Sequence, residues 1–211
     1  MPLPHSFGAA ARPRPVRTVE IFARAKLPSR FGDFEVVSFT DERGATLDDV
    51  AIVRGDVAGG ESVPTRVHSE CLTGDVFGSM RCDCREQLEL ALERFATEDA
   101  AVIIYMRQEG RGIGIAHKVR AYALQEQGLD TVEANLHLGF DSDLRDYGAA
   151  AAMLRALGVV SVGLHTNNLE KIAGLQKYGV PVTERISIQS VPGEHNERYL
   201  ATKREKCGHL L

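Results

Sequence analysis

The sequence lacks the features that mark two large classes of protein. Lys and Arg together number 25 and Asp and Glu number 29, so the net charge is −4 and positive charge is not in excess. A general nucleic-acid-binding protein is usually basic, and we therefore expect no nucleic-acid partner. No apolar run approaches the ~20 residues of a membrane span, and the N-terminal segment lacks the apolar stretch of a secretory signal. We expect a cytoplasmic protein without a membrane partner.

Internal repeats and linker-like stretches are also absent, which favours a single folded domain. Residues 1–18 carry four prolines and three arginines and are expected to form a flexible tail. Residues 19–211 are long enough to bury one sizeable core. At this length we expect no additional fused domain.

The pattern of apolar residues predicts an α/β-type fold (mixed α+β), with a β-rich first third and strand–helix units after it. Strands are expected at 31–40, 50–53, 63–68, 101–106, 159–164 and 180–188. Helices are expected around 88–95, from 115 to about 128, at 144–157 and from about 171 to 178. The run Ala101–Met106 is apolar throughout, which is typical of a strand buried on both faces.

Cysteine is scarce, but three of the four cysteines lie in one short window: Cys71, Cys82 and Cys84. In a reducing compartment, a close set of thiols indicates metal binding rather than disulfides. Three protein ligands leave one tetrahedral position open, which is how zinc is held when it is catalytic. The alternatives are three buried structural thiols, or a closed structural site completed by a residue such as His68. Cys207 lies far away among charged residues and is expected not to be a ligand.

Four polar segments around this window are candidates for binding an anion. In an extended 66–70 segment, Arg66, His68 and Glu70 would share one face beside the cysteines, unless that face is simply solvated. The segment 108–114 follows a buried strand and is rich in glycine, so its amides and Arg111 could meet phosphate oxygens. It matches neither GxGxxG nor a P-loop, and its alternative is a plain strand–helix turn.

The other two segments lie later in the chain. Asp143 and Arg145 could both point into one site, or an Asp of this stretch could instead cap a helix beside a surface salt bridge. Thr166, Asn167 and Asn168, followed by Lys171, could hold a phosphate at a helix start, or they could form an N-cap without a ligand. No single segment is decisive. Taken together with an open metal site, they predict metal-assisted hydrolysis of a phosphorylated small molecule.

Longer motifs carry a resemblance to a known family. RVHSECLTGDVFGSMRCDCREQLE, YMRQEGRGIG, RAYALQEQG, DTVEAN, DLRD, LHTNNLEKI and EKCGHLL, in unbroken order from about Val19 to Leu211, are similar to GTP cyclohydrolase II. That family converts GTP to formate, pyrophosphate and 2,5-diamino-6-ribosylamino-4(3H)-pyrimidinone 5′-phosphate, the first step of riboflavin biosynthesis. The resemblance departs at Arg85, where glycine is common, and this departure puts only the local turn in doubt.

The resemblance implies a role for each matching position. Cys71, Cys82 and Cys84 would bind one zinc ion per subunit, and Mg²⁺ would enter with GTP. Tyr122 would help to complete the chemistry at the zinc site, Asp143 would accept a proton and Arg145 would act as nucleophile. The subunits would form a homodimer. The positions implied to bind GTP are Arg66, Val67, His68, Ser69, Glu70, Gln87, Glu109, Gly110, Arg111, Thr131, Thr166 and Lys171.

Two other functions stay open at this point. The same chemistry, or a reaction that stops at the formamidopyrimidine, could serve a secondary-metabolite pathway. A regulator that binds the nucleotide without turnover is disfavoured, because the three cysteines, Asp143 and Arg145 are all present.

Overall fold

A computed structural model describes residues 18–141 and 143–189 of the chain. The expected tail (apart from residue 18), Cys207 and the EKCGHLL motif lie outside these residues. No helix in the described ranges is long and apolar enough to cross a membrane.

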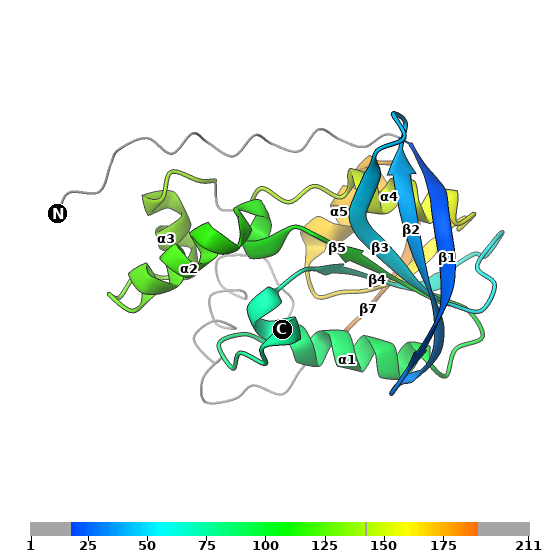
Figure 1. The fold of residues 1–211 in the computed structure, drawn as a ribbon, viewed down its shortest axis with the longest axis horizontal. Helices are drawn as coiled ribbons and strands as arrows, with labels where there is room; N and C mark the ends of the chain where they lie inside the picture. The colour runs from blue at the N-terminus through cyan, green and yellow to red at the C-terminus, as the bar shows by residue number, and fades with distance from the viewer. Residues whose placement is uncertain (1–17, 142, 190–211) are drawn as a thin grey trace.

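Seven strands form one mixed sheet in the order β1-β2-β3-β5-β4-β6-β7 (Figure 1). The first four in this order pair antiparallel, and β5, β4, β6 and β7 are parallel. The expected mixed α/β class is confirmed. The strands are β1 (Val19–Ser29), β2 (Gly32–Asp41), β3 (Thr46–Arg54), β4 (Val63–Ser69), β5 (Ala101–Met106), β6 (Val162–His165) and β7 (Val182–Ile186).

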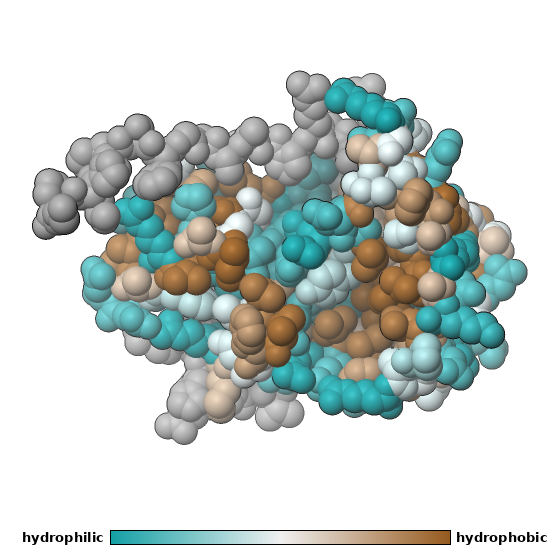
Figure 2. All heavy atoms as spheres, viewed as in Figure 1, coloured by the Kyte–Doolittle hydropathy of each residue, from teal (hydrophilic) through white to brown (hydrophobic). Residues whose placement is uncertain are grey.

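Helices cover both faces of the sheet, and α2 and α3 extend beyond its end (Figure 1). The α-helices are α1 (Cys84–Phe95), α2 (Gly114–Gln125), α3 (Thr131–His137), α4 (Gly148–Ala156) and α5 (Leu169–Lys177). Two short helical turns, η1 (Leu72–Val76) and η2 (Glu109–Gly112), follow β4 and β5 directly. On the face seen in Figure 2, apolar side chains gather over α2 and over the strands, with hydrophilic side chains between them.

The core consists of two apolar clusters separated by the sheet. Val102 and Ile104 of β5 belong to the larger cluster, which includes most of α4. Ala101 and Ile103 belong to the smaller cluster, together with Phe95 of α1. Alternate residues of β5 are therefore buried on opposite faces, which accounts for the uninterrupted apolar run.

Several elements of the structure differ from those expected from the sequence. β1 was not expected, because as an edge strand it exposes nearly all of its side chains and shows no buried alternation. α3 was also missed. α4 begins at Gly148 rather than at 144, because Leu144 N–H donates to the Arg111 carbonyl and Arg145 N–H donates to Asp143 Oδ1, at 3.0 and 2.9 Å. These bonds hold the preceding residues outside the helix.

Candidate metal centre and active-site cavity

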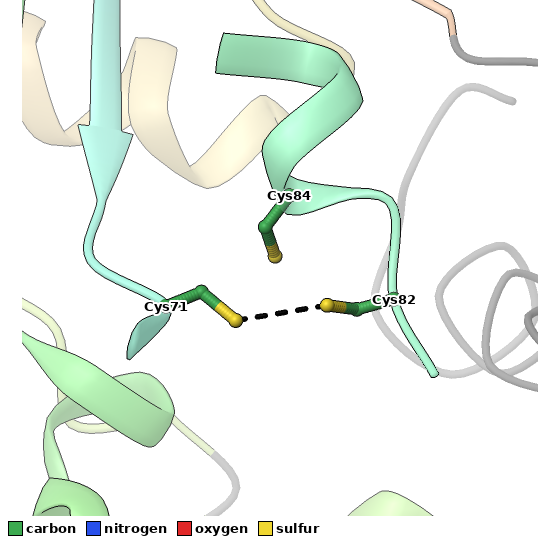
Figure 3. Close-up of side chains that lie close together, drawn as sticks. All are labelled: Cys71, Cys82 and Cys84. Carbon is green, nitrogen blue, oxygen red and sulfur yellow. Dashed lines mark hydrogen bonds between the residues drawn. The ribbon is translucent and has the colours of Figure 1, made fainter. Parts of the chain in front are cut away.

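The three cysteines converge because β4 and α1 deliver them to one point. Cys71 follows β4 and caps η1, Cys82 lies in the loop after η1, and Cys84 is the first residue of α1. Their sulfurs point toward one another (Figure 3) and lie within 4.8 Å of each other, with 3.6 Å between Cys71 and Cys82. Zn–S bonds of about 2.3 Å at tetrahedral angles separate two sulfurs by roughly 3.8 Å. The group therefore fits a tetrahedral, thiolate-bound metal.

Gly74 makes room for this group. A Cβ at position 74 would lie 2.9 Å from the sulfur of Cys82, 3.1 Å from the sulfur of Cys71 and 3.2 Å from Cys84 Cβ. The backbone of η1 thus packs directly against all three cysteines. Gly74 N–H also donates to Cys71 Sγ at 3.4 Å.

A closed site completed by His68 is not what the structure presents. Among the described residues, the cysteines form the only group of three or more His, Cys, Asp or Glu side chains within ligating reach of one another, and His68 is not part of it. His68 Nε2 instead hydrogen-bonds Asp75 Oδ2 at 3.0 Å. Asp75 also accepts from the Cys71 N–H at 3.0 Å and from the Tyr105 hydroxyl at 2.8 Å. This buried cluster holds η1, and with it Cys71, against the sheet.

The thiols interact so closely that one of them ionises first. Hydrogen bonds from Cys82 and Cys84 lower the pKa of Cys71 far below its usual value, with help from the Lys118 ammonium and against the effect of burial. The hydrogen bond to Cys71 raises the pKa of the Cys82 thiol to about 11. A metal ion that binds all three sulfurs must therefore displace protons, so its affinity decreases as pH falls.

Lys118 of α2 joins the cysteines to two other polar groups. Its Nζ donates to Glu109 Oε1 at 2.7 Å, to Thr73 Oγ1 at 3.0 Å and to Cys71 Sγ at 3.1 Å. Burial alone would lower the pKa of Lys118, but Glu109 and Cys71 outweigh it and hold this pKa above its usual value. Thr73 Oγ1 lies 3.4 Å from the hydroxyl of Tyr122. Burial raises the pKa of Tyr122, so this hydroxyl keeps its proton at neutral pH.

Arg66 and Lys171 are held by buried partners. Arg66 donates to the His165 carbonyl at 3.2 Å and to Gln87 Oε1 at 2.6 Å. Burial lowers the pKa of Arg66 to about 10, so it remains a cation at neutral pH. Lys171 donates to the Val67 carbonyl at 2.6 Å. Arg66 of β4 and Lys171 of α5 thus place two buried cations on the lining of the cavity that also contains the three cysteines.

The glycine-rich segment after β5 is more than a plain turn. Gly110 and Arg111 both have φ of 63°, in the left-handed region that glycine enters easily and arginine rarely does. Glu109 accepts from the Leu72 N–H at 2.6 Å, so η2 is fixed to η1 beside the cysteines. A strained conformation at a non-glycine residue is typical of functional segments.

Asp143 and Arg145 form a bidentate ion pair, with Nε of Arg145 at 2.9 and 3.0 Å from the two carboxylate oxygens. Both side chains are mostly buried, so this is not a surface salt bridge. Burial would raise the pKa of Asp143, but its bonds to Arg145 outweigh burial and lower it. The alternative of an Asp at the helix start is met by Asp146, not Asp143: Asp146 Oδ1 accepts from the N–H of Gly148, the first residue of α4, at 2.8 Å. Asn168 caps α5 through the Glu170 N–H.

A cavity of about 700 Å³ brings most of the predicted residues together. It opens where the carboxyl ends of β5, β4 and β6 meet, the usual ligand position in parallel sheets. Its lining includes the three cysteines and Arg66, His68, Ser69, Glu70, Gln87, Glu109, Gly110, Arg111, Tyr122, Arg145, Thr166 and Lys171.

Two predicted residues, Val67 and Asp143, lie elsewhere. Val67 is buried in the larger apolar cluster and offers only its carbonyl, to Lys171. Asp143 lines a second cavity of about 200 Å³, which shares Arg145 with the first. Thr131 begins α3, and its neighbours Asp130 and Glu133 line the large cavity.

Sequence reasoning missed Lys118 and Thr73. Lys118 occupies a helix position whose neighbours gave no sign of a buried charge, and only the packing of α2 against η1 brings it to Cys71. Thr73 lies within the cysteine window, but nothing in the spacing singled it out.

Comparison with known proteins assigns the chain to a family. The family model described as GTP cyclohydrolase II matches residues 20–187. The chain belongs to the GTP cyclohydrolase II family. Riboflavin biosynthesis protein RibBA of Bacillus mycoides is 54% identical to it over 92% of this chain and 48% of that protein. RibBA of Bacillus subtilis is 56% identical over 88% of this chain and 46% of that protein. The chain spans about half the length of the curated relatives it matches.

One solved structure is also similar. It is RibBX, a two-domain 3,4-dihydroxy-2-butanone 4-phosphate synthase from A. baumannii, with a TM-score of 0.46 and 18% identity over 83% of this chain and 41% of that one.

Proposed function

We propose that the chain is a zinc-dependent enzyme that hydrolyses GTP to formate, pyrophosphate and 2,5-diamino-6-ribosylamino-4(3H)-pyrimidinone 5′-phosphate, in the first step of riboflavin biosynthesis. The observation that carries this proposal is the convergence of three cysteine sulfurs on a cavity that also contains Arg66, Arg111 and Lys171. Guanine would lie near the cysteines and the phosphates near the cations. The names of the relatives favour riboflavin biosynthesis over a secondary-metabolite pathway.

The metal would be held by Cys71, Cys82 and Cys84, one ion per subunit. Zinc bound there would supply Lewis acidity that makes water a nucleophile at neutral pH. Hydrolysis of the imidazole ring at C8 and release of formate consume two water molecules. Tyr122 keeps its proton and lies within reach of Thr73, so it would donate a hydrogen bond or a proton to the opened formamide.

The phosphate end of the reaction would depend on Arg145 and Asp143. As nucleophile, Arg145 would attack the α-phosphorus, pyrophosphate would leave, and Asp143 would take the proton from the guanidinium. Water would then cleave the phosphorus–nitrogen bond. The high pKa of a guanidinium makes this step demanding, and in the alternative Arg145 only stabilises the charge of the transition state. The closeness of Asp143 to Arg145 supports either role.

Substrate would be held by the segment 66–70 with Gln87, by the η2 residues Glu109, Gly110 and Arg111, and by Thr131, Thr166 and Lys171. Mg²⁺ would enter with the triphosphate. We also propose the folded domain 19–211, a homodimer and a cytoplasmic location for the chain.

The test is incubation with GTP and Mg²⁺ while formate, pyrophosphate, the pyrimidine product and bound zinc are measured together. We expect formate and pyrophosphate from the zinc-loaded protein. Cys82→Ser removes one of three ligands, so both zinc content and formate release should be lost. Ser79→Ala, a change in the same loop without a ligand, is the control. Formate production by zinc-free Cys82→Ser at the wild-type rate would refute the metal assignment.

A further inference from the structure

Lys118 is a cation in direct contact with the cysteine group, through Cys71. It is 9% exposed, and its three donors reach Cys71 Sγ, Thr73 Oγ1 and Glu109 Oε1. A lysine ammonium has three donors, so these contacts can use all of them. These three hydrogen bonds fix the orientation of the ammonium group, and one of them goes to the sulfur of Cys71.

The charges explain why a cation is needed there. Three thiolates around a divalent ion leave one net negative charge in a buried site, and an uncompensated buried charge is costly. Lys118 offsets that charge from 3.1 Å. A hydrogen bond to a thiolate also withdraws electron density from sulfur, so less is donated to the metal and the ion remains a stronger Lewis acid.

Glu109 and Thr73 connect Lys118 to the turn η1 as well as to the cysteines. Glu109 fixes Lys118 and, through its other oxygen, accepts from the Leu72 N–H, so the lysine is anchored to the same turn that holds the cysteines. Thr73 Oγ1 accepts from Lys118 and lies 3.4 Å from the Tyr122 hydroxyl and 3.6 Å from Cys71 Sγ. The metal ligand Cys71 and the hydroxyl of Tyr122 are thus linked through one ammonium group.

We propose that Lys118 is a positioning residue of the metal centre: it donates a hydrogen bond to the Cys71 thiolate and orients Tyr122 through Thr73. The proposal rests on the proposed zinc site. It assigns to Lys118 control of the electron density on one metal ligand and a link, through Thr73, from that ligand to Tyr122.

The experiment compares four proteins: wild type, Lys118→Met, Glu109→Gln and the double variant Glu109→Gln/Lys118→Met. Each is loaded with Co²⁺, whose absorption bands report on thiolate ligands, and each is titrated with Zn²⁺ against a chelator. Loss of the N–H···S bond raises the energy of the sulfur electrons. The thiolate-to-cobalt band should therefore move to longer wavelength in both proteins that lack Lys118, and stay in place in Glu109→Gln.

Zinc affinity should fall about 10- to 100-fold in the same two proteins, the usual effect of losing a partner of a metal ligand. Lys26→Met, an exposed lysine on β1, is the control and should leave both readouts unchanged. The double variant removes Glu109 and Lys118 together, so neither is left buried without the other, and it separates the donor from a general effect on folding. If the double variant returns to the wild-type band and affinity, Lys118 acts only by neutralising Glu109 and the proposal is overturned.

Two failures can be told apart. If wild type binds neither Co²⁺ nor Zn²⁺, the proposed metal site itself is wrong. If wild type loads normally and Lys118→Met has the same band position and the same affinity, only the role of Lys118 is wrong.

Discussion

Gly74→Ala tests the metal centre without replacing any of the three cysteines. The added methyl carbon would lie 2.9 Å from Cys82 Sγ and 3.1 Å from Cys71 Sγ. Non-bonded carbon contacts are most favourable at roughly 3.5–4.0 Å, so the sulfurs must move apart by several tenths of an ångström. Such overpacking typically costs about 1–3 kcal/mol. Because 1.4 kcal/mol is tenfold in a binding constant, zinc affinity should fall roughly 5- to 150-fold.

The assay is a chelator competition under reducing conditions, with circular dichroism of the zinc-free protein to confirm that the fold persists. Without metal the loop can relax, so most of the strain should appear in binding. Val76→Ala removes an exposed side chain from the same turn and serves as the control. Unchanged zinc affinity in Gly74→Ala would mean that the three sulfurs do not gather around one ion as they do in the structure.

Two further predictions concern Tyr122 and His165. Tyr122→Phe removes the hydroxyl near Thr73, so the formamide intermediate should accumulate, as seen by chromatography of the products; wild-type product ratios would rule out that role. Burial, aided by Arg94 and Arg66, lowers the pKa of His165 to about 4. The unfolded chain takes up this proton near pH 6.5, so stability should be complete at pH 7 and decline toward pH 4, by about 2 kcal/mol between pH 7 and 5. His165→Phe should reduce that decline in urea unfolding at the two pH values, and a slope equal to that of wild type would contradict the assignment.

The part of the fold near the site was predictable because its signals are local. The apolar run Ala101–Met106 matches β5 residue for residue, since both faces of that strand are buried. The spacing of Cys71, Cys82 and Cys84 indicated one metal group. The structure brings their sulfurs together because only the turn η1 and a short loop separate Cys71 from the start of α1. In both cases the residues that form the pattern are close together in the chain, so the pattern can be recognised without knowing the contacts of distant segments.

Features that depend on distant contacts were not predictable. β1 is stabilised as an edge partner of β2, and its own exposed side chains carry no periodic signal. The start of α4 is delayed by a bond from Leu144 to Arg111, 33 residues earlier in the chain by their numbering. The contact of Lys118 with Cys71 spans 47 residues. Spacing within one segment cannot reveal such pairs.

The place of β4 in the sheet has a consequence for the synthesis of the protein. β4 lies between β5 and β6, and both of these partners come after the cysteine window in the chain. Arg66 of β4 bonds the carbonyl of His165, 99 residues later. A ribosome therefore releases all three cysteines long before the sheet that aligns them can close. The cysteines of a newly made chain therefore lack the strands that flank β4 until β5 and β6 have been synthesised.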